Sequence, residues 1–149
     1  MIYADHAATT KISETAKLAM LSAMEKDWYN PSSLYTPGQQ ASGTLMDARV
    51  RIARCLGCLP KEIYFTSGGS EADNQAILSA AAIGKRQGKM HIISTAFEHH
   101  AVLHTLKKLE KEGFEITLLD VGEKGIVSPV QVEKSNSSRY NTCYGYVCQ

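Results

Sequence analysis

Apolar and polar positions follow a helical period in the first part of the chain. Between residues 13 and 26, apolar side chains recur every three or four positions, and Ser13 precedes them as a plausible N-cap. A second helix is expected to open at Thr36 and Pro37, with the threonine as its cap, and to end at Gly57. The pattern therefore predicts two helices before residue 60.

After residue 60, short apolar runs alternate with further helical periods. The expected strands are 63–65, 91–94 and 114–119, and the expected helices are 72–86 and 98–112. This order implies right-handed crossovers and a mostly parallel sheet with flanking helices. We predict an α/β fold whose site lies at the carboxyl ends of the strands, where residues 67–71 and 98–100 fall.

Composition narrows the class of protein only slightly. With 149 residues, 44% of them hydrophobic and 21% charged, the chain fits one soluble globular domain. A net charge of +1 gives no argument for nucleic acid or a membrane surface, and no signal peptide is visible, so we expect a cytoplasmic protein. Cys55 and Cys58 form a C-x-x-C without a second pair, and we interpret them as incidental thiols.

Two stretches have candidate chemistry. Gly68 and Gly69 are expected to allow backbone angles and close approach that a Cβ would forbid, and Ser70 is expected to cap the following helix. Free N–H groups at such a helix start, with the serine hydroxyl, can bind a phosphate, although an ordinary crossover has the same pattern. His99 and His100 could stack on a ring or transfer protons, or they could simply be polar residues that start a helix.

Four motifs identify a resemblance over residues 1–134. In chain order they are DHAATT (5–10), NPSSLYTPGQQA (30–41), TSGGSEADN (66–74) and FEHHAVL (97–103). Together they resemble the cysteine desulfurases, pyridoxal-phosphate (PLP) enzymes of the class V aminotransferases, of the nitrogen-fixation and iron–sulfur-cluster type. The resemblance implies part of the large domain of PLP fold-type I.

The resemblance also assigns residues. Gly69 and Ser70 match positions that hold the PLP phosphate, and His99 matches the histidine that stacks on the pyridine ring. The segment 7–10 matches one close to the active site, and His6 stands where the family usually has asparagine. Asn74 and Glu98 are expected to support local structure. The implied reaction converts L-cysteine to L-alanine and passes persulfide sulfur to a scaffold protein for cluster assembly or tRNA thiolation; the full-length enzyme would be a homodimer.

By the same resemblance, several essential parts would follow residue 149. These are the aspartate at the pyridine nitrogen, the Schiff-base lysine, the nucleophilic cysteine and the small C-terminal domain, so we expect this chain alone to be inactive. Two alternatives stay open: another class V enzyme such as a selenocysteine lyase, and a non-catalytic module that binds a desulfurase partner. An incomplete parallel sheet would also leave apolar surface uncovered, which predicts marginal stability.

Residues 135–149 differ in character from the rest of the chain. SNSSRYNTCYGYVCQ is rich in Cys, Tyr, Asn and Ser, and it has no strand or helix period. Codons for it exist whose reading one base later gives AIRPDTILVTVMYAN, a buried-strand pattern that resembles the family's next segment. We therefore expect a one-base insertion near Lys134, with Cys143 and Cys148 as accidents of frame.

Overall fold

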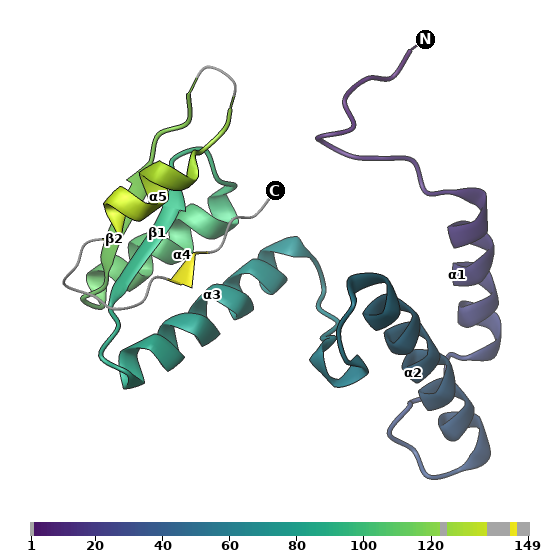
Figure 1. Cartoon of the computed structure of the whole chain (residues 1–149). Helices are drawn as coiled ribbons and strands as arrows, with labels where there is room; N and C mark the ends of the chain where they lie inside the picture. Colours follow the sequence, from purple (N-terminus) through teal and green to yellow (C-terminus); the bar gives the residue numbers. More distant parts are fainter. Residues whose placement is uncertain (1, 123–124, 137–143, 146–149) are drawn as a thin grey trace. The chain divides into compact units, whose positions relative to one another are not determined.

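A computed structural model describes residues 2–122, 125–136 and 144–145 of the chain (Figure 1). The chain divides into two units, Met1–Phe65 and Thr66–Gln149, which are called the first and the second unit below. The tail cysteines Cys143 and Cys148 lie outside the described residues.

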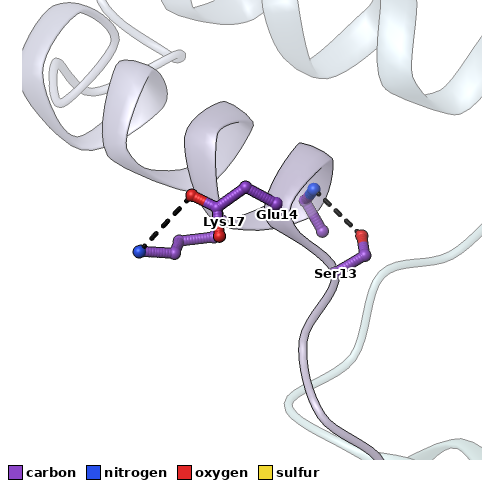
Figure 2. Close-up of polar contacts among 4 residues, drawn as sticks. Ser13, Glu14 and Lys17 are labelled. Atoms are coloured by element: carbon purple, nitrogen blue, oxygen red, sulfur yellow. Dashed lines mark hydrogen bonds and ion pairs between the residues drawn. The ribbon is translucent and has the colours of Figure 1, made fainter.

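The first helix of the first unit is α1, Glu14–Lys26. The Ser13 hydroxyl accepts a hydrogen bond from the Ala16 N–H at 3.2 Å, so the predicted N-cap is confirmed (Figure 2). The ion pair between Lys17 and Glu14, at 3.5 Å, joins two well exposed side chains and stabilises the helix only slightly. No residue of α1 is buried.

The second helix, α2, spans Thr36–Leu56. It begins one residue earlier than predicted: Tyr35 is the N-cap position, no side chain caps the helix, and the expectation for Thr36 is wrong. Gly57 ends the helix as predicted, because its φ of 68° is a left-handed conformation that favours glycine. A short 3₁₀ helix, η1, follows at Pro60–Glu62.

The strand predicted at residues 63–65 does not form. This segment is held against α2 instead, since the Arg49 Nε–H donates to the Ile63 carbonyl at 3.2 Å. The Arg49 guanidinium also lies 5.1 Å from the centroid of the Phe65 ring, within range of a cation–π contact. A strand requires a neighbour for its N–H and C=O groups, and every strand of the described residues belongs to the second unit.

The second unit alternates helices and strands, as predicted. Its elements are α3 (Gly69–Arg86), β1 (His91–Thr95), α4 (His100–Lys111), β2 (Glu115–Leu119), α5 (Pro129–Ser135) and β3 (Tyr144–Gly145). Within the described residues the sheet has the order β2-β1-β3, and β1 pairs in parallel with both neighbours. The parallel sheet is thus confirmed. The tail, whose sequence has no strand period, contributes the short strand Tyr144–Gly145.

The core of the second unit lies where α3 and α4 pack against each other and against the sheet. Its buried apolar side chains are Ile77, Ala81, Val102, Leu106, Leu109 and Phe114. Leu109 is the most buried large side chain of the group, with 2% of its surface exposed. Burial of these side chains holds α3 and α4 together, and the N-terminal ends of these two helices form the candidate site.

The first unit leaves much of its apolar surface exposed. Leu34 is 90% exposed, Trp28 67% and Met24 64%. The uncovered surface predicted above belongs to the incomplete sheet, so the exposure of these side chains in the first unit is a separate finding. In the part of the chain that the structure describes, no helix has the length and hydropathy needed to cross a bilayer.

Candidate functional site

The start of α3 has no side-chain cap. Gly68 occupies the N-cap position, and Ser70 lies inside the first turn, so the expectation that Ser70 caps the helix is wrong. Neither Gly68 nor Gly69 lies in the left-handed region, and the φ of 167° at Gly68 is extended backbone that any residue adopts. The turn therefore does not need glycine for its angles, contrary to the sequence-based expectation.

Space is the property that the two glycines do provide. A Cβ built on Gly68 or on Gly69 would meet no heavy atom within 4 Å, and Ser70 is exposed. The first N–H groups of a helix point outward from its N-terminal end and have no hydrogen-bond partner within the helix. With the Ser70 hydroxyl beside them, they offer hydrogen-bond donors in open space, which suits a phosphate group.

Glu71 closes the turn that leads into α3. One oxygen of its carboxylate, Oε2, accepts from the Ser67 hydroxyl at 2.6 Å and from the Ser67 N–H at 2.7 Å. These two hydrogen bonds, the hydroxyl contact being the stronger influence, hold the pKa of Glu71 below its ordinary value of 4.5. Because Ser67 is engaged in this way, an anion at the turn would depend on the donors of Gly69 and Ser70.

The start of α4 is capped by a histidine. His99 is the N-cap, and its Nδ1 accepts from the Ala101 N–H at 3.1 Å. An imidazole nitrogen accepts only when it is unprotonated, so a neutral ring in this contact has its proton on Nε2. The interpretation of His99 as a helix-starting residue is confirmed. Its side chain is nevertheless exposed, which leaves Nε2 and the ring faces open to a ligand.

Asn74 links the two helix starts. Its Nδ2 donates to the Ser70 carbonyl at 2.7 Å and, from α3 to α4, to the Ala101 carbonyl at 3.4 Å. Its Oδ1 accepts from the Thr105 hydroxyl at 2.5 Å, and the Thr105 side chain is only 4% exposed. The turn that contains Ser70 is thereby fixed relative to the turn that contains His99, and the expected supporting role of Asn74 agrees with these contacts.

Thr105 is a buried partner of Asn74 that the sequence analysis did not identify. A signal was available, because Thr105 lies among the apolar residues Val102, Leu106 and Leu109, all buried, where a polar side chain needs a partner. Glu98 has the local role expected of it, since its Oε1 accepts from the Thr95 hydroxyl at 2.9 Å, at the end of β1.

Two segments were predicted to follow the carboxyl ends of strands, and the structure confirms this for one of them. Residues 98–100 do follow the carboxyl end of β1, which is Thr95. Residues 67–71 follow the irregular segment 63–65, so no strand places them. The loop that connects β1 with α4 is therefore the part of the site that the sheet positions.

The other candidate residues have local contacts. His6 belongs to the first unit, where its ring lies 5.4 Å from that of Tyr3, and the Tyr3 hydroxyl donates to the Thr9 carbonyl at 3.0 Å. Cys55 and Cys58 are free thiols. Among the described residues, no group of three or more His, Cys, Asp or Glu could hold a metal ion.

A parallel α/β unit in which a helix starts without a side-chain cap, beside open space, is typical of proteins that bind phosphates and phosphate-containing cofactors. Within that class, the sequence pattern of the family described as aminotransferase class-V matches residues 2–148. The chain belongs to this family.

Curated relatives are cysteine desulfurases by name. The chain is 46% identical over 134 residues to "Putative cysteine desulfurase IscS 1" of Bacillus subtilis (strain 168), and 44% identical over 134 residues to "Cysteine desulfurase IscS" of Methanosarcina thermophila. Both alignments cover 90% of this chain, but only 35% and 33% of the relatives. The chain thus spans about a third of the length of the curated relatives that it matches.

Solved structures agree with this assignment. A NifS-like protein superposes with a TM-score of 0.80 at 33% identity, covering 87% of this chain and 35% of that one. "SspA in complex with cysteine" superposes with a TM-score of 0.82 at 34% identity, covering 91% and 39%. The chain therefore has the fold of the corresponding part of PLP fold-type I enzymes.

Proposed function

We propose that residues 1–134 are the part of a PLP-dependent cysteine desulfurase that holds the cofactor's phosphate and one face of its ring. The family pattern extends to residue 148, and we propose from the character of the sequence that residues 135–149 are nevertheless not part of that domain. The observation that carries the proposal is the uncapped start of α3, joined through Asn74 to the turn that contains His99. Family membership and the names of the relatives support it.

Each site residue has a role that its surroundings allow. Gly69 and Ser70 would hold the phosphate, through N–H groups and the Ser70 hydroxyl that open into free space. His99 would stack on the ring, and its Nδ1 contact with Ala101 fixes which nitrogen bears the proton. When bound, PLP supplies an electron sink for bond cleavage in an amino acid substrate.

L-Cysteine is the substrate that we infer. The relatives are named for its desulfuration, and one similar structure is described as a complex with cysteine. In the full-length protein the sulfur would pass to a cysteine thiolate and then to a scaffold protein, and two copies would form a homodimer. Because this chemistry needs reduced thiols, we place the protein in the cytoplasm.

Residues 1–149 by themselves should not turn over L-cysteine. They span about a third of the relatives, and by resemblance the lysine and the cysteine of the reaction lie in the remaining part. The proposed contribution of this chain is therefore cofactor binding. Binding is what the experiment must measure.

Binding of pyridoxine 5′-phosphate by residues 1–149 tests the proposal. This alcohol has the phosphate and the ring of PLP but cannot form imines with surface lysines. Equilibrium dialysis should show saturable binding, and Ser70→Ala should raise the Kd about tenfold, because a hydrogen bond to a charged group contributes about 1.5 kcal/mol or more.

Ser79→Ala is the matched control, since Ser79 is an exposed serine of the same helix, away from its start. The control should bind like the unmodified chain, and pyridoxine without its phosphate should bind far more weakly. Equal affinities for the Ser70→Ala and Ser79→Ala variants, or no saturable binding at all, would reject the proposed phosphate site.

A further inference from the structure

Helix α4 has two histidines one turn apart, His100 and His104, beyond the contacts assigned above. Their ring centroids are 5.6 Å apart, and the ring planes differ by 24°. Both side chains are exposed. Residues four apart lie on the same face of a helix, so the two imidazoles stand side by side in solvent.

Two parallel imidazoles at this spacing can act as a chelating pair. Neutral imidazole nitrogen is a preferred ligand of Ni²⁺, Cu²⁺ and Zn²⁺. An ion bonded to two such nitrogens at about 2.1 Å each holds them no more than about 4 Å apart. Rings whose centroids are 5.6 Å apart can reach this arrangement through rotation of their side chains, without movement of the helix.

His100 and His104 are the two histidines on this face of α4. His99 is the next histidine, with its centroid 6.0 Å from that of His100 and its ring tilted by 51°. It occupies the N-cap position, where its contact with Ala101 holds the ring, so it does not share the face of the other two. Lys108 follows His104 by one helical turn, and its positive charge opposes a bound cation, although both residues are exposed and solvent screens the repulsion. Water would complete the coordination.

We propose that His100 and His104 form a two-histidine site for a divalent first-row transition metal ion. The site lies on α4 and does not depend on PLP binding or on the desulfurase proposal. Because the ion would bind the folded helix and not the unfolded chain, it would also stabilise α4.

A titration of residues 1–149 with Ni²⁺ alone, followed by NMR of the histidine ring protons, tests this proposal. The paramagnetic ion should broaden the ring signals of His100 and His104 first, before those of His6 and His91. His104→Gln should weaken Ni²⁺ binding by at least about tenfold, since a single imidazole replaces two ligands held together. His6→Gln, in an exposed segment of the first unit, should leave the affinity unchanged.

Cysteine thiols are the main competing ligands for the ion. The titration is therefore repeated with all four cysteines, Cys55, Cys58, Cys143 and Cys148, changed to serine, and the same two histidine signals should broaden at the same Ni²⁺ concentration. Loss of binding in this variant, or an unchanged affinity after His104→Gln, would overturn the two-histidine site.

Discussion

The Glu71 carboxylate sets the charge of the turn that precedes α3. It lies close to the helix start, where a negative charge is favourable, and it accepts two hydrogen bonds from Ser67. Both effects favour the ionised form. The turn that would receive the phosphate is therefore fixed by a group that titrates at acid pH.

The stabilising effect of Glu71 should disappear as the pH falls. Its folded-state pKa is depressed by the Ser67 hydroxyl first and the Ser67 N–H second, so its contribution is complete above the unfolded pKa and is lost as the pH falls through the folded pKa, below 4.5. A ¹³C NMR titration of the side-chain carboxyl measures the folded value. Ser67→Ala should raise this pKa toward the ordinary value, because it removes the larger of the two causes.

Ser79→Ala provides the comparison, since Ser79 lies two turns further along α3 than Glu71. The Glu71 titration should be the same in this variant as in the unmodified chain. If Ser67→Ala left the pKa unmoved, the Ser67 hydroxyl could not be what holds the carboxylate in place.

At the scale of elements, two glycines of α2 should respond in opposite directions to alanine. A Cβ on Gly38 would lie 2.7 Å from the Ser33 Cβ and 2.8 Å from the Asn30 carbonyl oxygen, whereas a Cβ on Gly43 would meet nothing within 4 Å. Gly38→Ala should therefore destabilise the chain by about 1–3 kcal/mol through overpacking. Gly43→Ala should stabilise it by about 0.5–1 kcal/mol through helix propensity.

Urea unfolding followed by circular dichroism at 222 nm compares the two variants directly. Because both substitutions add one methyl group to the same helix, propensity alone would move both midpoints upward. A higher midpoint for Gly38→Ala would show that the loop before α2 does not pack against Gly38 in this way.

Local signals predicted the helices well. Ser13 caps α1, and Gly57 ends α2 with a left-handed φ, because each depends only on residues within one or two turns. The strand predicted at 63–65 failed for the opposite reason. Strand propensity at Ile63, Tyr64 and Phe65 stabilises a strand only beside a neighbour, and here the contacts with Arg49 replace one.

For the whole molecule, motif order predicted which residues belong to the candidate site but not how they are connected. The sequence indicated Gly69, Ser70 and His99, and the structure joins their turns through Asn74. The contact of Asn74 with Thr105 joins residues 31 positions apart, so it depends on how α3 packs against α4. A hydrogen bond of this kind cannot be read from either helix alone.

The tail raises a question about the gene itself. Residues Tyr144 and Gly145 form β3, which pairs in parallel with Ile92 and Ile93 of β1. The reading one base later places Thr and Val at these two positions, inside the run ILVTVMY, whose β-branched and apolar residues suit a strand next to β1 far better. The pairing with β1 and the strand propensity of the shifted residues therefore both indicate that the shifted reading is the original sequence of this segment.

We expect the DNA to contain one extra base at or shortly before the codon of Lys134. Sequencing across this codon in independent isolates measures it directly. An isolate without the base should continue in the reading AIRPDTILVTVMYAN, and its protein should form a third strand over the run ILVTVMY. DNA whose second frame does not encode this run would rule out the insertion, and SNSSRYNTCYGYVCQ would then be a native segment that supplies β3 with its own residues.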